Sequence, residues 1–352
     1  MRLLILAQAV DLDDPVLGFF DRWLEEFAAR YESIEVVCLK EGRHSLPANV
    51  HVHSLGKPSF AKASKGTGAR LTSRIKYILN FYRYLWKLRG SYDAVFVHMN
   101  QEYVLLGGIF WRLFGKKIVL WRNHRKGSLA TRIAGMLADT VCYTSPASYV
   151  AAFKNSAIMP VGIDTEFFAP QKVNRPESSI LFLGRLDPVK RPEIFIDALQ
   201  QLRDEGVAFT ADIVGDPSKG SEDYTHDVRN RAATLALDGS LRFLPGVTQD
   251  AARDLFASHA IYVNLTPSGS FDKTIGEAMA SGCIVVVSND AVRLVLGDSL
   301  VVSDTQGTAR ALTIALSMPQ GERSEMALRN RAYIEREHSL ALLSSKLAAL
   351  YA

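Results

Sequence analysis

Apolar and polar positions alternate in two periods along the 352 residues of this chain. Short apolar runs, typical of buried strands, are separated by longer segments in which apolar residues recur every three to four positions, as on a packed helix. In the first half this pattern predicts strands at 3–7, 35–39, 94–98 and 118–121 and helices at 19–30 and 104–114. The alternation restarts at 180, and the last helices are predicted from 309 to 350. This order indicates an α/β protein with doubly wound parallel sheets, and the length suits two domains.

One segment, at 265–287, joins a polar loop, a short helix and a buried strand. Asp272 can cap the helix at its start, and Gly282 can provide the left-handed turn that ends it. The unpaired N–H groups and partial positive charge of the helix N-terminus suit a phosphate group. Glu277 lies about one turn further along, where a carboxylate can accept hydrogen bonds from both hydroxyls of a ribose. The alternative is a helix that only packs on a strand and exposes one glutamate to solvent.

A second segment, at 180–192, reads as a buried strand, a turn at Gly184 and a basic loop, followed by a helix. Arg185 and Lys190 project from that loop, where the end of the strand meets solvent. Two cations in this position suit a diphosphate, since arginine binds as a fork and lysine as a point charge. An ordinary basic turn is the alternative for either residue taken alone.

Together the two segments closely resemble the retaining glycosyltransferases of family 4, which have the two-domain GT-B fold. In that family an arginine and a lysine of such a loop hold the donor's diphosphate, which implies this role for Arg185 and Lys190. A second family motif has two glutamates eight positions apart, and Glu277 matches the second of them. Gly269 stands where the first is expected, so the glutamate that contacts the donor sugar is absent. We infer that Asp272 or the backbone N–H groups of 270–273 replace it.

The resemblance extends to most of the chain and implies its domain organisation. It implies an acceptor-binding Rossmann-like domain at 1–165, a linker at 166–178, a nucleotide-sugar-binding Rossmann-like domain at 179–335 and a returning C-terminal helix at 336–352. His124, which ends a predicted strand, is expected to face the donor from the first domain and to join Arg185, Lys190 and Glu277 as a catalytic residue. The other residues expected at the donor are Gly18, Gly184, Leu244, Val247, Gly269, Ser270, Phe271, Asp272, Lys273 and Thr274.

Polar residues after two strands of the first domain are candidate acceptor contacts, namely Asp13, Asp14, His98 and Asn100. Asp11 and Asp13 also match an Asp-x-Asp metal motif. We predict no metal and no cofactor, because enzymes with the GT-B fold generally neutralise the leaving diphosphate with arginine, lysine and helix dipoles. The donor is expected to be a UDP- or GDP-linked sugar. A strand-end histidine such as His98 is often structural, and Gly18 can equally serve to begin a helix.

Charge is distributed unevenly between the two halves. Residues 1–160 carry a net charge of +10 and residues 161–352 one of −6. From Gly42 to Tyr92 there are ten basic residues and no acidic one, and such a block favours an anionic surface. No nucleic-acid recognition motif accompanies the charge, so a nucleic-acid partner is not expected.

A helix within this basic block has two apolar flanks. The stripe predicted to face the core is Leu71, Ile75, Ile78, Leu79, Tyr82, Leu85 and Trp86. Further aromatic and apolar residues widen it on one side, namely Tyr77, Phe81, Tyr84 and Leu88, while Lys76, Arg83 and Lys87 line the other. The helix is suited either to lie on an anionic membrane surface or to pack in a core with a solvated basic flank. The segment at 56–69, rich in glycine, serine and lysine, is predicted to be a loop.

The sequence predicts a retaining glycosyltransferase that moves a sugar onto a lipid-linked or cell-surface glycan acceptor. Two alternatives are an epimerase or phosphorylase with the same fold, and a non-catalytic, membrane-associated nucleotide-sugar-binding protein. No secretory leader or membrane-spanning run is evident, so we expect a cytoplasmic protein, peripheral on the inner face of the cell membrane. Three scattered cysteines, each among apolar residues, are expected to be buried thiols.

Overall fold

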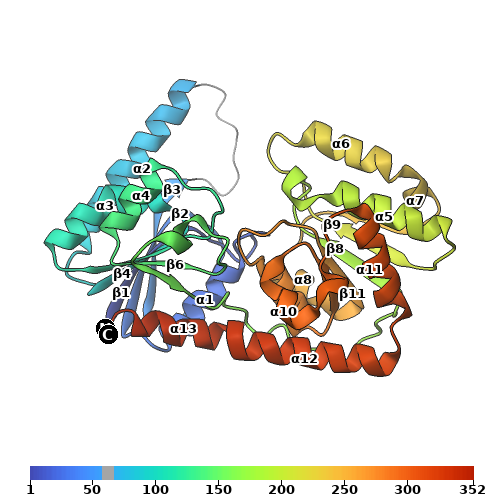
Figure 1. Cartoon of the computed structure of the whole chain (residues 1–352). Coiled ribbons are helices and arrows are strands. Elements are labelled where there is room, and N and C mark those ends of the chain that lie inside the picture. The colour runs from blue at the N-terminus through green and yellow to red at the C-terminus, as the bar shows by residue number, and fades with distance from the viewer. Residues whose placement is uncertain (58–66) are drawn as a thin grey trace. The chain divides into compact units, whose positions relative to one another are not determined.

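The computed structural model describes residues 1–57 and 67–352, and only the backbone of 67–71. The described chain divides into two compact units, 1–160 together with 340–352, and 161–339. Each unit has its own parallel sheet with helices on both faces (Figure 1). The predicted linker at 166–178 belongs to the second unit, whereas the last helix belongs to the first.

The sheet of the first unit has seven strands in the order β3-β2-β1-β4-β5-β6-β7. The strands are β1 (Arg2–Val10), β2 (Ser33–Glu41), β3 (Val50–Lys57), β4 (Ala94–His98), β5 (Lys117–Trp121), β6 (Thr140–Tyr143) and β7 (Ser156–Ile158). The helices are α1 (Phe19–Ala28), α2 (Thr67–Lys87), α3 (Gln101–Leu113), α4 (Leu129–Leu137), α13 (Leu340–Ala349) and the 3₁₀ turn η1 (Tyr149–Ala152).

Side chains alternate between the two faces of this sheet, as its strand geometry requires. Leu3 and Ile5 of β1 enter a core beneath α1 and α13, whereas Leu4 and Leu6 enter a second core beneath α2 and α3. Helix α13 packs against α1 and is also joined to the sheet, because the hydroxyl of Tyr351, just beyond the helix, donates to the carbonyl of Val95 at 2.9 Å.

The sheet of the second unit has five strands in the order β10-β9-β8-β11-β12. They are β8 (Ser179–Leu183), β9 (Thr210–Val214), β10 (Leu241–Leu244), β11 (Ile261–Asn264) and β12 (Ile284–Val287). The α-helices are α5 (Pro192–Asp204), α6 (Glu222–Arg231), α7 (Ala233–Leu237), α8 (Gln249–Ser258), α9 (Lys273–Ala280), α10 (Arg293–Leu296), α11 (Thr305–Ser317) and α12 (Gln320–His338). Three 3₁₀ turns complete the unit, η2 (Pro188–Lys190), η3 (Asp290–Val292) and η4 (Asp298–Leu300).

Two arginines connect other segments of the chain to this second core. The guanidinium of Arg175 donates to the carbonyls of Phe256 and Ser281 at 3.0 and 2.8 Å, and that of Arg331 to the carbonyl of Ala280 at 2.6 Å. Backbone carbonyls at helix ends lack partners within the helix, and these guanidinium groups supply them. The segment before β8 and helix α12 are therefore anchored to the end of α9.

Helix α2 corrects one prediction. Its side chains Phe81 and Leu85 are buried and pack, with Leu88 just after the helix, on the core beneath α2 and α3, whereas Ile75, Ile78, Leu79, Tyr82 and Trp86 are exposed. Of the stripe predicted to face the core, only Leu85 is buried, and the side chain of Leu71 lies outside the described residues. The helix is apolar over more than one face. The face that is buried carries Phe81, whose ring contacts those of Tyr103 and Trp111 in α3.

Candidate functional site

The second sheet has a topological switch point between β8 and β11. From β8 the chain continues to β9 and β10 on one side, and then crosses to β11 and β12 on the other. Loops that leave neighbouring strands in opposite directions open a crevice at the carboxyl ends of those strands, where ligands of doubly wound proteins bind. The two loops here are 184–191 and 265–272, which are the two segments singled out from the sequence.

The loop after β8 is held in place by its neighbour β9. The N–H of Gly184 donates to the carbonyl of Val214 at 3.0 Å, and that of Leu186 to the carbonyl of Asp216 at 2.9 Å. Gly215 has φ of +154°, and a Cβ there would overlap the Gly184 carbonyl. Arg185, between these fixed points, is exposed and forms no hydrogen bond or ion pair with a described residue. Its guanidinium is therefore available to a ligand.

Lys190 ends the 3₁₀ turn η2, which Asp187 caps by accepting a hydrogen bond from the N–H of Val189 at 3.0 Å. Its ammonium group forms an ion pair with Asp272 across the switch point. The two side chains are 17% and 16% exposed, so the pair is largely removed from water. Lys190 thus links the loop after β8 to the start of α9.

Asp272 is the N-cap of α9, as predicted, and it also joins several polar side chains. Besides Lys190, its carboxylate accepts hydrogen bonds from Asn264 at 3.1 Å, Thr266 at 3.2 Å and the Thr274 hydroxyl at 3.1 Å. Although burial opposes ionisation, Lys190 and these donors hold the pKa of Asp272 well below its usual range. The carboxylate is therefore already engaged in the fold.

The backbone beside Asp272 offers the other replacement that we inferred for the missing glutamate. Among the described residues, no acceptor takes the N–H of Ser270 or of Phe271. The Ser270 carbonyl accepts from the Asn289 amide at 2.7 Å, and the Phe271 ring lies 4.7 Å from that of His338. Gly269 is buried at the start of this stretch. The loop is fixed at both ends while its N–H groups remain available.

Glu277 lies one turn into α9 and is only 2% exposed. No described residue donates a hydrogen bond to its carboxylate, and burial raises the pKa of Glu277 above its ordinary value. On the same helix face, the ammonium of Lys273 donates to the carbonyl of Gly162 at 2.6 Å, and burial lowers the pKa of Lys273. The attraction between the two charges opposes both shifts. A buried carboxylate without hydrogen bonds is uncommon and marks a candidate for ligand binding.

Leu244 and Val247 flank the end of β10, two strands away from β8. Both are partly buried against the core of the second unit. Gly246 between them donates its N–H to Asp216 at 3.0 Å, and a Cβ at Gly246 would lie 2.6 Å from that carboxylate. These two residues expected at the donor are thus at the same carboxyl edge of the sheet as Arg185.

The predicted aspartates of the first unit follow β1, at the switch point between β1 and β4. Asp13 pairs with Arg43 at 2.6 Å and Asp14 with Lys40 at 3.3 Å. Lys40 also pairs with Asp11, at 2.8 Å. Each carboxylate therefore has a cationic partner from β2 or from the chain just after it, and no group of three or more potential metal ligands occurs in the described chain.

The remaining predicted residues of the first unit have different surroundings. The N–H of Gly18 donates to the Asp14 carbonyl at 2.9 Å, which forms the turn that precedes α1. His98 is buried and stacks on Phe20 with ring centroids 4.7 Å apart, so it belongs to an aromatic cluster. Asn100 precedes α3 and lines a pocket. His124 is exposed in part, and desolvation and the nearby charge of Arg122 lower its pKa.

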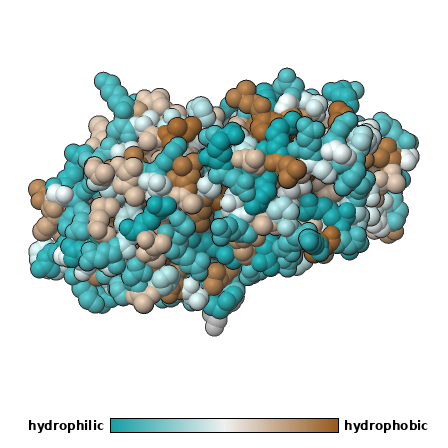
Figure 2. All heavy atoms as spheres, turned by 90° about the horizontal axis from the view of Figure 1, so that it is seen from below, coloured by the Kyte–Doolittle hydropathy of each residue, from teal (hydrophilic) through white to brown (hydrophobic). Residues whose placement is uncertain are grey.

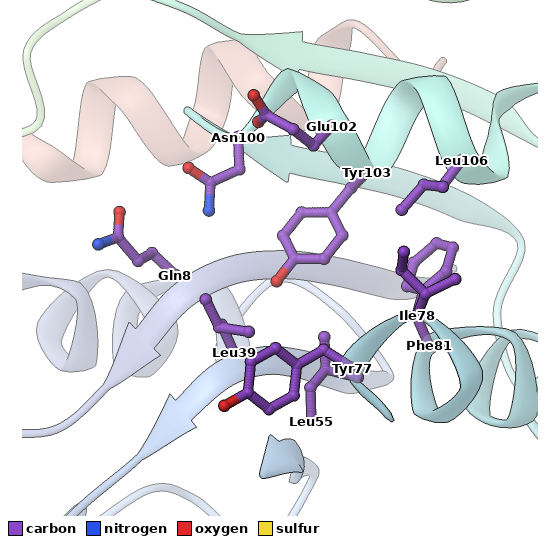
Figure 3. A pocket seen from close by; sticks show the side chains of 10 residues that line it. All are labelled: Gln8, Leu39, Leu55, Tyr77, Ile78, Phe81, Asn100, Glu102, Tyr103 and Leu106. Carbon is purple, nitrogen blue, oxygen red and sulfur yellow. The ribbon is translucent and has the colours of Figure 1, made fainter. Parts of the chain in front are cut away.

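Sequence reasoning missed that pocket, which has a volume of about 390 Å³. Its lining comes from three strands and two helices: Gln8, Leu39, Leu55, Tyr77, Ile78, Phe81, Asn100, Glu102, Tyr103 and Leu106 (Figure 3). One signal was present in the sequence, since Gln8 is the single polar residue in the run from Leu3 to Val10.

Part of this chain resembles known proteins in sequence. The profile of the family described as Glycosyl transferases group 1 matches residues 177–317. A D-inositol 3-phosphate glycosyltransferase from Streptomyces bingchenggensis is 27% identical over 146 residues, which are 38% of this chain and 32% of that protein. The chain thus aligns with about a third of the length of this curated relative.

Solved structures resemble the whole chain. Anabaena Alr3699/HepE in complex with UDP and glucose has a TM-score of 0.75 at 18% identity, with 99% of both chains covered. Sucrose-phosphate synthase from Thermosynechococcus elongatus has a TM-score of 0.77 at 15% identity, with 100% of this chain and 98% of that one covered. At these identities the likeness shows the fold.

The protein is therefore an α/β protein of the GT-B class, which confirms the fold predicted from the sequence. The profile described as Glycosyl transferases group 1 covers 177–317, less than half of the chain, so in sequence the second unit is what resembles that family.

The described helices include none with the length and apolar character needed to cross a bilayer. The face shown in Figure 2 is mostly hydrophilic, with hydrophobic side chains in small separate groups.

Proposed function

We propose that this protein is a retaining glycosyltransferase whose second unit binds a nucleotide-diphosphate sugar. The observation that carries the proposal is Glu277, a buried carboxylate without a hydrogen bond from any described residue, one turn inside a helix that begins at the switch point. A ribose diol would supply the two missing donors. The solved neighbour that holds UDP and glucose favours UDP over GDP as the nucleotide.

The chemistry proposed for this site is electrostatic. Arg185 is exposed in the loop after β8, and the ammonium group of Lys190 pairs with Asp272, the N-cap of α9. Positive groups fixed in this way stabilise the negative charge that grows on the diphosphate as the sugar leaves. His124, with its lowered pKa, is proposed as a neutral contact to the donor from the first unit.

The first unit is proposed to bind a glycan acceptor, lipid-linked or part of a cell-surface polysaccharide. Its outer apolar surface, defined here as Tyr82, Trp86, Ile109, Phe110, Leu113 and Phe114, supports a membrane location. Trp86 is 59% and Leu113 80% exposed, and the rings of Trp86 and Phe110 lie 6.3 Å apart. Exposed aromatic groups beside the basic residues Arg83 and Lys87 suit an anionic bilayer surface. We propose that the protein is cytoplasmic and peripheral on the inner face of the membrane.

Binding of UDP-glucose and other nucleotide sugars, measured by calorimetry, tests the donor site. Glu277→Gln should weaken binding by roughly tenfold or more, since a hydrogen bond to a charged group is worth ~1.5–3 kcal/mol. Glu325→Gln, at an exposed position of α12, is the matched control and should bind as the wild type does. Equal affinity of the Glu277 variant would remove this carboxylate from the site. Donor binding without transfer or hydrolysis would favour the non-catalytic alternative.

Sedimentation with lipid vesicles tests the membrane proposal. The protein should bind anionic vesicles at low salt and detach as salt rises, because ions screen the attraction of its cations. The double variant Trp86→Ala, Leu113→Ala should bind less, whereas Leu328→Ala, at an exposed position of the second unit, should not change binding. Lys62, Lys65 and Arg70 of the basic block lie outside the described side chains, so the test uses α2 and α3. Equal binding to neutral and anionic vesicles would contradict the proposal.

A further inference from the structure

The pocket of the first unit forms where the strands extend beyond the helices that cover them. Leu4, Leu6 and Gln8 lie on the same face of β1, since they alternate with residues of the opposite core. Leu4 and Leu6 are buried, whereas Gln8 is exposed at the carboxyl end of the strand. Helices α2 and α3 form the walls beyond it. The pocket therefore opens at the edge of the sheet where β1 and β4 end.

The lining of the pocket has an apolar part and a polar part (Figure 3). Phe81, Ile78 and Leu106 lie together at one end, and Gln8 and Asn100 lie at the other. The Tyr103 ring stands between them, fixed because its hydroxyl donates to the Ala7 carbonyl at 3.3 Å. A site with one apolar and one hydrogen-bonding end selects an amphiphile rather than a free sugar.

Glu102 lines the polar end of this pocket and is also near His124, the residue proposed to face the donor. It is exposed in the first turn of α3, and its charge is close enough to act on both Arg122 and His124. A hydroxyl held by Glu102 or Asn100 would therefore be on the same edge of the unit as His124. The volume of about 390 Å³ is within the range of small-molecule sites.

We propose that this pocket binds the apolar segment of an amphiphilic acceptor, with the hydroxylated head of the acceptor at Asn100 and Glu102. This inference rests on the proposed function and specifies its acceptor class: a glycan or hydroxyl group attached directly to an alkyl, isoprenoid or ring-containing segment. The pocket selects for that segment, whereas the outer apolar surface serves only to hold the protein at a bilayer.

The test compares octyl β-glucoside, below its micelle concentration, with methyl β-glucoside, which has the same head without the chain. Each methylene that is fully buried strengthens binding about fourfold, so two buried methylenes suffice for a preference of more than tenfold. Ile78→Trp and Leu106→Trp fill the pocket from different helices and should each remove most of that preference. Glu102→Ala should weaken both glucosides by a similar factor and leave their ratio unchanged.

Two controls separate binding in the pocket from binding at the outer apolar surface and at the donor site. Trp86→Ala alters the outer apolar surface and should keep the preference for the octyl chain. The proposal would be overturned if the wild type bound octyl β-glucoside and methyl β-glucoside with nearly equal affinity. It would also be overturned if the preference for octyl β-glucoside were lost in the Trp86 variant and kept in both pocket variants. Binding of UDP-glucose, measured on the same samples, reports on the donor site alone. If the wild-type protein does not bind UDP-glucose, that result contradicts the proposed function but not the pocket.

Discussion

Replacement of Asp272 distinguishes a structural carboxylate from one that contacts the donor sugar. The sequence made Asp272 a candidate for replacing the glutamate that Gly269 displaces. In the structure its oxygens cap α9 and accept from Lys190, Asn264 and Thr266. Asp272→Ala removes all of these contacts, whereas Asp272→Asn keeps an oxygen that can still cap the helix and removes the charge that pairs with Lys190.

The expected cost follows from the environment of the pair. Loss of an N-cap costs ~0.5–2 kcal/mol, and breaking a buried ion pair costs ~3–5 kcal/mol. Because the Lys190 and Asp272 side chains keep 17% and 16% of their exposure, water can partly replace the lost partner. We therefore expect a total of about 3 kcal/mol for Asp272→Ala and about half of that for Asp272→Asn.

Thermal unfolding measured by calorimetry without nucleotide is the assay. For a unit of this size about 3 kcal/mol corresponds to a fall of roughly 6–12 °C in Tm. All four tryptophans are in the first unit, at positions 23, 86, 111 and 121, so tryptophan fluorescence reports on that unit alone. The lowered transition should therefore be seen by calorimetry and not by fluorescence. An Asp272→Ala protein with unchanged Tm and lost donor affinity would refute this reasoning and make Asp272 a donor contact.

Three further predictions concern the second unit. Arg185→Ala should leave Tm unchanged and lower kcat more than donor affinity, because charge on the diphosphate grows toward the transition state; equal losses would indicate ground-state binding only. Asp212 accepts two hydrogen bonds from Arg242, both at 2.8 Å, and one from His259, at 3.2 Å, and its pKa is lowered to about 2. The ionised Asp212 should contribute roughly 2 kcal/mol to the stability of the fold, in full above about pH 4 and less as the pH falls toward about 2. Asp212→Asn should therefore be less stable at about pH 7, and acid unfolding curves should show a smaller change in its stability between about pH 4 and about pH 2. Gly215→Ala should fail to give a folded second unit by circular dichroism and proteolysis, since a Cβ would overlap the Gly184 carbonyl; a native-like variant would contradict that close approach.

The sequence predicted four of the seven strands of the first sheet and the two loops at the switch point of the second, because these depend on local pattern. Buried strands and helices produce a periodic pattern of apolar residues in the sequence. A helix cap such as Asp272 likewise depends only on residues close to it in the sequence. The pairing of Lys190 with Asp272 joins residues 82 positions apart, so no local pattern records it. The pocket around Tyr103 likewise requires three strands and two helices to be placed together.

Helix α2 shows where periodicity fails in principle. Both Phe81 and Leu79 lie on apolar stripes, and nothing in the helix sequence specifies which stripe the sheet will accept. The structure buries the stripe with Phe81, whose ring centroid is 5.6 Å from that of Tyr103, and exposes the stripe with Leu79 and Trp86. Shape complementarity between side chains decides this choice, and it is set by the partner surface rather than by the helix.

Two features of this loop affect the choice of donor sugar. Position 269 is a glycine where the resembled family has a glutamate, and the carboxylate of Asp272 is already bound by other side chains of the protein. With its carboxylate taken by Lys190 and polar side chains, Asp272 has little capacity left for sugar hydroxyls. The available groups are then the N–H groups of Ser270 and Phe271, which donate hydrogen bonds where a glutamate would accept them. A sugar hydroxyl can donate a hydrogen bond to a glutamate or accept one from an N–H. The hydrogen bond from a neutral N–H is weaker than the one to a charged carboxylate, although both depend on the orientation of the hydroxyl. We therefore expect weaker discrimination between sugars that differ at one hydroxyl than a glutamate at 269 would give, and Gly269→Glu is the variant in which that discrimination should increase.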